Sequence, residues 1–240
     1  MTTLFISDLH LCPSRPHITR IFHEFLAGPA QQADSLYILG DLFEYWAGDD
    51  DLDDPFNAIN CAALRALSDS GVPVFFMAGN RDFLAGEGFA HAAGLSLLPE
   101  PAVVDIHGEP TLLMHGDTLC IDDDAYQAFR AEVRSPDWQQ AFLALPLTRR
   151  KSQIELLRRE SEAQKLIKTA QIMDVNPDAV LQALTLHQCT RLIHGHTHRP
   201  ARHDHVAGGK HCERWVLPDW YETGGYLACA GSGCGQVKLD

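Results

Sequence analysis

Short apolar runs that end in polar turns are the feature of this sequence that most constrains its fold. Three such runs, at residues 4–6, 36–39 and 74–77, have the length and composition of buried strands. Between them, over 18–26 and 56–67, apolar residues recur with the three- and four-residue spacing of an amphipathic helix. Strands that alternate with helices predict a layered α/β fold.

The second half of the chain predicts further strands, interrupted by a long helical region. A strand pair is expected at 102–106 and 111–114, and strands return at 191–193 and in the tail. From about residue 122 to residue 187 the pattern is almost continuously helical, with prolines as breaks. Because 240 residues suit one α/β core, we expect a single domain over 1–240 with this segment as a helical insertion, or lid.

The bulk composition argues against several classes of protein. Nineteen Lys and Arg against 32 Asp and Glu give a net charge of -13, which argues against a broad contact with nucleic acid. The first residues lack the pattern of a signal peptide and no run approaches the length of a membrane span, so neither is expected. Seven cysteines without a C-x-x-C pair indicate reduced thiols in the cytosol rather than a disulfide framework.

Potential metal ligands occur in five clusters, each directly after an apolar run: Asp8-Leu9-His10, Gly40-Asp41, Gly79-Asn80-Arg81-Asp82, His115-Gly116-Asp117 and Gly195-His196-Thr197-His198. Because strand ends meet at one edge of a sheet, these side chains can converge. In an extended segment residues i and i+2 point the same way, so each Asp-x-His or His-x-His pair can reach a common ion. Imidazoles, carboxylates and one amide oxygen suit Mn²⁺, Fe or Zn²⁺. One bridging carboxylate would hold two ions about 3.5 to 4 Å apart.

Each cluster also has a structural explanation when it is taken alone. Asp41 could cap the following helix, Asn80 could occupy a turn, and a lone Asp-x-His is more often a satisfied polar pair than a metal site. The two histidines at 196 and 198 are more specific, because two imidazoles on one side of an extended stretch seldom serve packing. The occurrence of all five clusters in strand-end positions favours the metal site.

These five blocks in this order resemble the calcineurin-like metallophosphoesterase superfamily, over residues 4–198. The resemblance implies a four-layer α-β-β-α sandwich and the attack of a metal-activated water on phosphorus. It implies that the ions are held by two sets of ligands that share one carboxylate: Asp8, His10, Asp41 and His198 for one ion, and Asp41, Asn80, His115 and His196 for the other.

Arg81 departs from the superfamily pattern, much of which has a histidine at this place that helps to protonate an alkoxide leaving group. Arginine cannot act as a general acid near neutral pH, although its planar fork can bind phosphate. The site should therefore favour a leaving group that is already stable as an anion, such as the phosphate released from a diphosphate. The structural alternative is a salt bridge from Arg81 to Asp82 or another acid.

Longer segments resemble, over nearly the whole chain, the family of UDP-2,3-diacylglucosamine hydrolases of lipid A biosynthesis: 5–11, 39–46, 79–83, 114–117, 172–176 and 192–200. The last forty residues match least. The resemblance implies cleavage of a nucleotide-lipid pyrophosphate to UMP and 2,3-diacylglucosamine 1-phosphate, with two Mn²⁺ per subunit, at the cytoplasmic face of the bacterial inner membrane. The substrate contacts that it implies are Asn80, Arg81, Asp123, Ser161, Lys165, Lys168 and His196.

The insertion is both apolar and basic. Its apolar residues could line a chamber for acyl chains: Leu143, Leu145, Leu147, Ile154, Leu157, Leu166 and Ile167. Its cations could meet phosphates or an anionic membrane surface: Arg149, Arg150, Lys151, Arg158, Arg159, Lys165 and Lys168. From the pattern alone, core packing and a solvated helix face are the simpler readings, and only the resemblance favours the chamber.

Two other functions remain open at this point. The first is a phosphodiesterase or phosphatase for a soluble substrate, in which the insertion is structural. The second is a catalytically silent scaffold, which the complete ligand set disfavours. We expect a peripheral membrane enzyme that acts as a monomer and does not bind nucleic acid.

Overall fold

The computed structural model describes residues 2–165 and 174–239, without the side chains of residues 160–165. Six strands form one sheet in the order β11-β10-β1-β2-β3-β4 and five form another in the order β5-β6-β7-β9-β8. The strands of the first sheet are β1 Thr2–Ile6, β2 Ser35–Leu39, β3 Val74–Met77, β4 Ser96–Leu98, β10 Gly224–Ala230 and β11 Gly233–Leu239. Those of the second are β5 Ala102–Ile106, β6 Glu109–Leu113, β7 Arg191–His194, β8 Ala201–Ala207 and β9 Lys210–Val216.

Seven helices accompany the sheets within the described residues: α1 Pro16–Ala27, α2 Pro55–Asp69, α3 Glu87–Ala93, α4 Asp124–Val133, α5 Pro136–Leu143, α6 Leu147–Lys165 and α7 Pro177–Leu186. Three of them begin with a polar cap followed by proline, at Asp54, Ser135 and Asn176. Each cap side chain accepts a backbone N–H of the first turn, and proline has no N–H that would need a partner there. The sequence thus sets these three helix starts locally.

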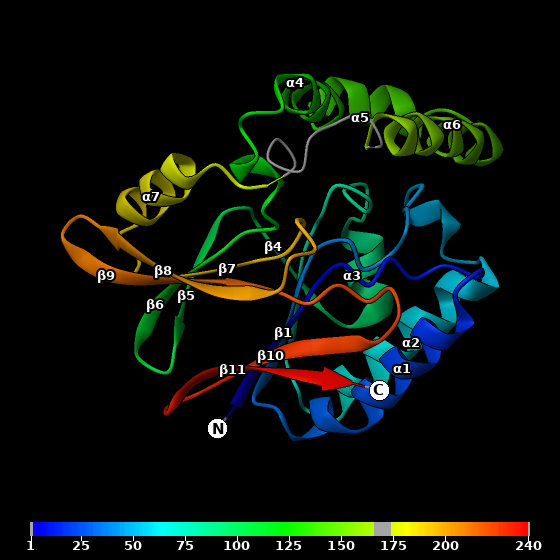
Figure 1. Ribbon diagram of the computed structural model, residues 1–240. Coiled ribbons are helices and arrows are strands. Elements are labelled where there is room, and N and C mark those ends of the chain that lie inside the picture. Colours follow the sequence, from blue (N-terminus) through cyan, green and yellow to red (C-terminus); the bar gives the residue numbers. More distant parts are fainter. Residues whose placement is uncertain (1, 166–173, 240) are drawn as a thin grey trace.

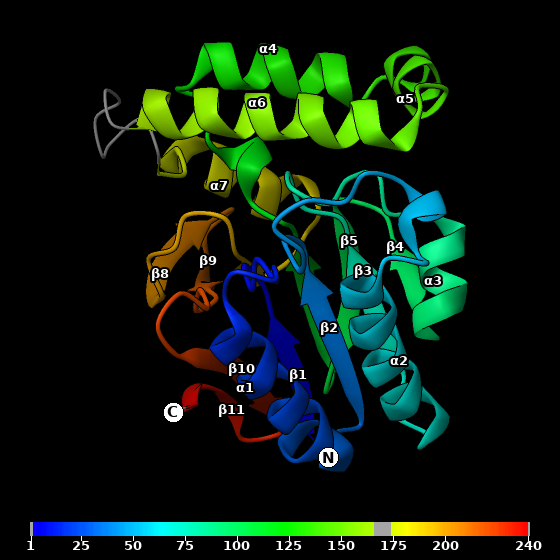
Figure 2. The same cartoon turned by 90° about the vertical axis from the view of Figure 1, so that its right-hand side faces the viewer.

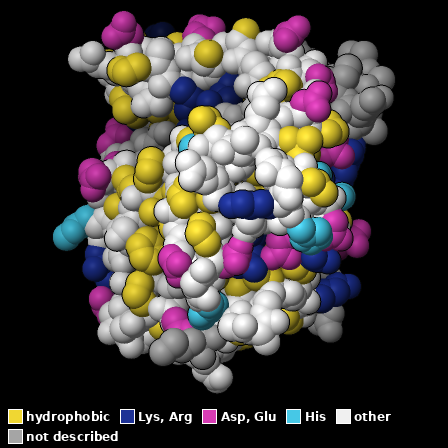
Figure 3. Space-filling model, turned by 90° about the vertical axis from the view of Figure 1, so that its left-hand side faces the viewer, with side chains coloured by type: hydrophobic (Ala, Val, Ile, Leu, Met, Phe, Trp, Pro, Cys, Tyr) yellow, Lys and Arg dark blue, Asp and Glu magenta, His cyan; other side chains and the backbone are white. Residues whose placement is uncertain are grey.

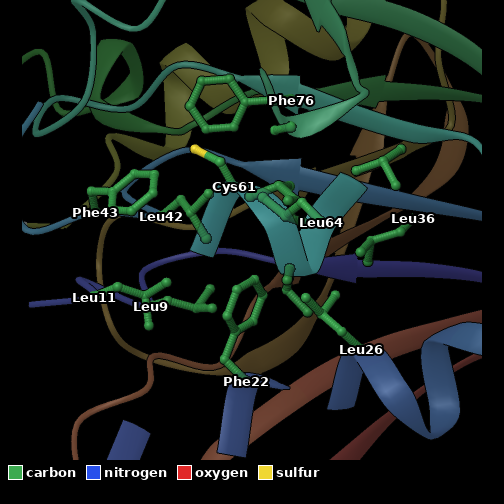
Figure 4. Close-up of a cluster of buried hydrophobic side chains, with 14 of the residues drawn as sticks. Leu9, Leu11, Phe22, Leu26, Leu36, Leu42, Phe43, Cys61, Leu64 and Phe76 are labelled. Carbon is green, nitrogen blue, oxygen red and sulfur yellow. The ribbon is translucent and has the colours of Figure 1, made fainter. Parts of the chain in front are cut away.

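Three hydrophobic clusters separate four layers, which confirms the predicted α-β-β-α sandwich. The first lies between helices α1 to α3 and the six-stranded sheet; Figure 4 shows Phe22 and Leu26 from α1 and Leu64 from α2 in this cluster. The second lies between the two sheets, with Phe5, Leu113 and other fully buried side chains. The third lies between the five-stranded sheet and α7 (Figure 1).

Helix α7 therefore belongs to the fourth layer, although the sequence pattern placed it inside the insertion. Val180 and Leu184 of α7 are fully buried in the third cluster against Leu112 and Leu192 of the sheet. The remaining helices α4, α5 and α6 form a separate group that lies across the ends of the strands (Figures 1 and 2). We call α4 to α6 the cap. A helical pattern alone cannot distinguish these two locations, because both have an apolar face.

The cap is held to the sandwich by cations of α6 that bind core carboxyl groups. Arg150 is 1% exposed, donates to the carbonyls of Ala47 and Leu145, and pairs with Asp50. Lys151 Nζ lies 2.7 Å from Asp51 Oδ1. The expectation that these two cations face a membrane or substrate phosphate is wrong, because the acidic loop after β2 already binds them. Arg149 is exposed, as the expectation requires.

One cysteine pair departs from the expectation of reduced thiols. Cys229 of β10 and Cys234 of β11 form a disulfide, with Cα atoms 4.0 Å apart. The antiparallel register places them directly opposite each other, so the hairpin itself brings the sulfurs together. Among the described residues the other five cysteines are free. The disulfide could not be predicted from the five-residue spacing of these cysteines, because the sequence does not show which residues of the two tail strands face each other.

No helix of the described residues combines the length and the apolar character that a membrane span requires.

Candidate metal centre

Seven side chains that the sequence singled out converge where the strands of both sheets end. Asp8 and His10 follow β1, Asp41 follows β2 and Asn80 follows β3 in the six-stranded sheet. His115 follows β6, and His196 and His198 follow β7, in the five-stranded sheet. The two sheets thus meet at these loops, and the cap lies beyond them (Figure 2).

The first ligand group consists of Asp8, His10, Asp41 and His198. His198 Nε2 lies 3.4 Å from both Asp8 Oδ1 and His10 Nε2. His10 Nε2 lies 3.7 Å from Asp41 Oδ2. The donor atoms of Asp8, His10 and His198 therefore lie within 4.8 Å of one another, and Asp41 lies beside them next to His10.

The second ligand group consists of Asp41, Asn80, His115 and His196. Asn80 Oδ1 lies 3.0 Å from His115 Nε2 and 2.9 Å from His196 Nδ1. His115 Nε2 lies 3.7 Å from Asp41 Oδ1. The other oxygen of the same carboxylate faces His10, so Asp41 presents one oxygen to each group. A carboxylate in this position can bridge two ions.

The donor set and its electrostatics suit divalent ions. Asp8 Oδ1 is buried and has no hydrogen-bond partner among the described residues, although a buried oxygen normally has one. Burial lowers the pKa of His196 to about 3, so this imidazole is neutral at physiological pH, as a metal ligand must be. The residues present therefore fit a centre for hard or borderline divalent metal.

Five of the seven ligand residues have a left-handed backbone conformation, not an extended one, and this conformation directs their side chains toward the centre. The φ angles are +55° at Asp8, +48° at His10, +53° at Asp41, +68° at His196 and +53° at His198. The expectation that alternation along an extended segment brings these pairs together is wrong, because the strands end before the ligands. Asp and His are among the few residue types that tolerate this conformation, and such strain is typical of functional sites.

Two glycines permit the close approach of these loops. A Cβ atom at Gly79 would lie 2.2 Å from Asp41 Oδ1, and one at Gly195 would lie 2.2 Å from Asp8 Oδ2. Real Cβ atoms do not approach other atoms so closely, so any larger residue would push a ligand loop away. The glycine that precedes Asn80 and the glycine that precedes His196 are thus part of the site.

Groups behind the ligands hold them in place. Both oxygens of the buried Asp82 accept backbone N–H groups, 3.2 Å from Asp41, 2.7 Å from Leu42, 3.3 Å from Phe43 and 2.8 Å from Gly79. His115 Nδ1 lies 2.9 Å from the Leu39 carbonyl, which leaves Nε2 free to face the centre. We did not predict from the sequence that Asp82 holds the ligand loops, although its position directly after Asn80 and Arg81 could have suggested such a role.

Arg81 does not pair with Asp82, whose oxygens are engaged by backbone groups. Its backbone N–H donates to Asp41 Oδ1 at 2.8 Å, and its guanidinium Nη1 lies 4.0 Å from Glu44 Oε1. The salt bridge that we considered as the structural role of Arg81 is therefore made with Glu44 and not with Asp82. Glu44 also binds Arg158 of α6 at 2.9 Å and Arg15 at 3.1 Å. Three guanidinium groups around one carboxylate leave a local excess of positive charge beside the first ligand group.

A cavity of about 490 Å³ lies between the ligands and the cap. Its polar end contains His10, Asp41, Asn80, Arg81, Asp123, Arg158, His196 and His198. Its apolar walls come from the core and from all three cap helices: Trp46, Phe83, Leu84, Phe129, Val133, Trp138, Phe142, Ile154 and Leu157. One space is therefore lined both by metal-ligating and cationic side chains and by an extensive apolar and aromatic surface, as an amphipathic ligand would require.

The apolar wall agrees only in part with the residues expected from the sequence. Ile154 and Leu157 line the cavity, but Leu143 is exposed, Leu147 is not in the wall, and Leu145 packs against the first hydrophobic cluster. The aromatic residues of the wall were missed, although those of α4 and α5 recur at helical spacing. Five expected residues lie outside the described side chains: Ser161, Lys165, Leu166, Ile167 and Lys168.

The face that carries α7, β8 and β9 shows acidic, basic and histidine side chains intermixed, without a continuous basic surface (Figure 3). Arg202 lies 2.8 Å from Asp204 and 3.1 Å from Glu213, and Arg191 lies 2.5 Å from Glu213. Oppositely charged side chains on this face therefore pair with one another.

Comparisons with known proteins agree with this site. The family model described as Calcineurin-like phosphoesterase matches residues 1–200, which include all seven ligands. A UDP-2,3-diacylglucosamine hydrolase of Aromatoleum aromaticum is 55% identical over 97% of this chain and 95% of its own length. Proteins of the same name are 52% identical in Xanthomonas axonopodis pv. citri, over 100% and 99% of the two chains, and 53% identical in Escherichia coli, over 93% of each.

Proposed function

Because this chain belongs to the calcineurin-like phosphoesterase family, and within it to the UDP-2,3-diacylglucosamine hydrolases, we propose that it hydrolyses the pyrophosphate of UDP-2,3-diacylglucosamine. The products are UMP and 2,3-diacylglucosamine 1-phosphate, an intermediate of lipid A biosynthesis. The observation that carries the proposal is the single cavity that joins both ligand groups to an apolar chamber under the cap. A substrate with a diphosphate at one end and two acyl chains at the other matches this shape.

In this proposal the two ligand groups would hold two Mn²⁺ ions, and Asp41 would offer one carboxylate oxygen to each group. Such ions lower the pKa of a bound water and neutralise the charge on phosphoryl oxygens. The protein itself places a phosphate-binding side chain next to a metal ligand. Asn80 belongs to the second ligand group, and Arg81 follows it directly at the polar end of the cavity, where a diphosphate would lie.

Arg81 accounts for the choice of a diphosphate. Its guanidinium can hold phosphoryl oxygens with two parallel hydrogen bonds. It cannot deliver a proton to a leaving oxygen. The phosphate released from a pyrophosphate needs no such proton, whereas the alkoxide released from a simple phosphodiester does.

The cap in this proposal is a lid that forms one domain with the sandwich and holds the acyl chains. Phe129 of α4, Phe142 of α5 and Leu157 of α6 reach the cavity from three helices. Asp123, at the start of α4, lines the same cavity and is a candidate contact to the sugar. Ser161, Lys165 and Lys168 remain candidate substrate contacts from the end of α6 and the segment after it.

The test is the release of UMP from UDP-2,3-diacylglucosamine by the purified chain, after removal of metal with a chelator and readdition of Mn²⁺. Turnover should be restored by Mn²⁺, and parallel readdition of Mg²⁺, Zn²⁺ and Fe²⁺ ranks the metals. Faster hydrolysis of bis(p-nitrophenyl) phosphate than of the nucleotide lipid would instead support a soluble phosphodiester as substrate. No release of UMP with any of these ions would refute the proposal.

We place the enzyme as a monomer, peripheral on the cytoplasmic face of the inner membrane. Leu156 of α6 is 59% exposed and Arg149 of the same helix is exposed, so the cap offers both apolar and cationic groups to a lipid surface. Co-sedimentation with vesicles that contain anionic lipid, compared with purely zwitterionic vesicles, measures this binding. Equal loss of binding in Leu156→Ser and in Arg149→Ser would support it, and strong binding by both variants would contradict it.

A further inference from the structure

Helix α4 of the cap contacts three loops that carry ligands of the second group. Tyr126, Arg130 and Arg134 are four residues apart, so they lie on one face of the helix. Arg134 Nη2 donates to the Gly79 carbonyl at 2.8 Å, directly before Asn80. Tyr126 has its ring centroid 5.9 Å from that of His196. This face therefore meets the loops of Asn80 and His196.

Arg130 connects α4 to the third of these loops through two carboxylates. Its Nε donates to Asp117 Oδ2 at 2.7 Å and its Nη2 donates to Glu100 Oε2 at 2.8 Å. The other oxygen of Glu100 accepts the backbone N–H of His115 at 2.7 Å. Tyr126 adds a hydrogen bond from its hydroxyl to Asp117 Oδ2 at 2.8 Å. Asp117 and Glu100 are largely buried, so this chain of charged hydrogen bonds is protected from water.

A neighbouring face of the same helix lines the apolar chamber. Ala125, Phe129 and Val133 also lie four residues apart, and each directly precedes one of the three residues that make the polar contacts. Phe129 is 41% exposed and lines the cavity that acyl chains would fill. A shift of α4 that accommodates a ligand in the chamber would therefore also move Tyr126, Arg130 and Arg134.

We propose that α4 positions the second ligand group and couples lipid binding in the chamber to metal binding at Asn80, His115 and His196. This inference rests on the proposed function for the identity of the lipid. Tyr126, Arg130 and Arg134 are positioning residues, since they act through the ligand loops. Among the described residues, this face of α4 makes no hydrogen bond to Asp8, His10 or His198, which belong to the first ligand group alone, so the coupling favours one metal over the other. Coupling of this kind is reciprocal: a lipid that tightens the metal is itself tightened by the metal.

The test uses Mn²⁺ alone. The full chain is stripped of metal and titrated, and calorimetry and electron paramagnetic resonance resolve the two binding steps. Arg130→Met should weaken one step about 10- to 100-fold, the range found for groups that orient metal ligands, and leave the other step unchanged. Arg134→Met should weaken the same step. Tyr126→Phe, which removes one hydroxyl, should weaken it least.

A second substitution identifies the step that is affected. Asn80→Ala removes a ligand that only the second group contains. In this background Arg130→Met should have no further effect on the remaining site, because the two changes act on one and the same ion. A further loss of affinity for the remaining ion would overturn the assignment to the second group.

Arg159→Met is the matched control, because Arg159 is a cap arginine whose side chain is 72% exposed and pairs with Glu155 of its own helix. Its two binding steps should equal those of the wild type. Thermal unfolding of each metal-free variant identifies any that does not fold, and Tyr126→Phe keeps the inference testable if Arg130→Met is such a variant. Equal weakening of both steps, or no change in folded variants, would overturn the inference.

The lipid arm compares 2,3-diacylglucosamine 1-phosphate with glucosamine 1-phosphate, which has the same phosphate and no acyl chains. The acylated ligand should strengthen the second Mn²⁺ step more than the deacylated one, and Arg130→Met should abolish this difference. A difference that persists in Arg130→Met would contradict the coupling through α4. If neither ligand binds, the proposed function fails, while the titration with Mn²⁺ alone still decides the positioning role.

Discussion

His10 Nε2 and His198 Nε2 lie 3.4 Å apart although 188 residues separate them in the chain. Two imidazole nitrogens at this distance repel each other unless one carries a proton or a cation lies near both. Burial opposes protonation of both rings and lowers the pKa of His10 well below its usual range. At His198 the Asp8 carboxylate, 3.4 Å from Nε2, more than offsets burial and raises the pKa. In the metal-free protein His198 therefore holds a proton more readily than His10 does, and a metal ion competes with that proton.

Binding of Mn²⁺ should consequently release protons and become tighter as the pH rises. Burial opposes protonation of His115 as well, but Asp41, Asp117 and Asp8 raise its pKa to about 9. An imidazole must be neutral to bind a metal, so below pH 9 the ion competes with this proton. Calorimetry at pH 6.5, 7.5 and 8.5 in buffers of different ionisation enthalpy measures both quantities. Affinity that falls with rising pH would contradict the assignment of His115 and His198 as ligands.

The metal-free protein should lose stability as the pH rises from about 6.5 to 9. His115 has a folded-state pKa of about 9, above its ordinary value of 6.5, so its protonation stabilises the fold fully below pH 6.5. This contribution is lost as the pH passes through the folded-state pKa. Urea unfolding of chelator-treated protein across this range tests the sign. In His115→Gln the slope should be smaller, and an unchanged slope would assign it to another group.

Asp41→Ala should lower turnover by at least about 100-fold and reduce the number of bound Mn²⁺ ions, because it removes one donor atom from each ligand group. Asp69→Asn is the matched control, since the Asp69 side chain is 67% exposed at the end of α2 and far from the ligands in the fold. UMP release and metal content per chain are the measurements. Full metal content with lost turnover would show that Asp41 does not bridge two ions.

Arg81→His should change which leaving group the enzyme prefers. The substitution removes a phosphate-binding fork, so hydrolysis of UDP-2,3-diacylglucosamine should fall about 100-fold. It also introduces a possible proton donor, so hydrolysis of an alkyl phosphodiester should fall less or rise. Arg81→Lys, which keeps the charge but supplies no such acid, is the control. Equal losses on both substrates in Arg81→His would argue against the leaving-group explanation.

Arg150→Met should loosen the cap without touching the metal centre. The change leaves the carbonyls of Ala47 and Leu145 without their donor, and each unsatisfied buried group costs about 1 to 3 kcal/mol. Limited proteolysis should cut the cap earlier, while Mn²⁺ content stays the same. Arg149→Met alters the preceding, exposed arginine and should behave like the wild type. Cleavage rates that are equal in the two variants would show that Arg150 is not the anchor.

The sandwich and its ligand-bearing loops could be predicted because the information is local. Each apolar run forms a strand and each ligand follows directly, so the order Asp8, Asp41, Asn80, His115, His196 was visible before any packing was known. The directions in which the ligand side chains point could not be predicted, because the left-handed backbone at Asp8 and His196 has no clear pattern in the sequence.

The cap could be predicted as helical but not in its contacts. In the sequence, Arg150 cannot be distinguished from its neighbour Arg149. Arg150 is buried and Arg149 is exposed because the acidic loop after β2 lies against Arg150 and not against Arg149. The same holds for Glu44, which collects three arginines from distant segments, and for Cys229 with Cys234, whose pairing depends on hairpin register. Contacts between residues far apart in sequence depend on the assembled layers, which no local pattern specifies.

The left-handed backbone at five of the ligands also limits how this centre could be adapted to another metal. Asp, Asn, His and Gly accept that conformation readily, whereas β-branched and bulky residues do not. A designer seeking sulfur ligands for a softer ion would strain the loop at position 8, 10, 41, 196 or 198. Asn80 and His115, which have ordinary backbone angles, are the two places where the donor atom could be exchanged without reshaping the loop.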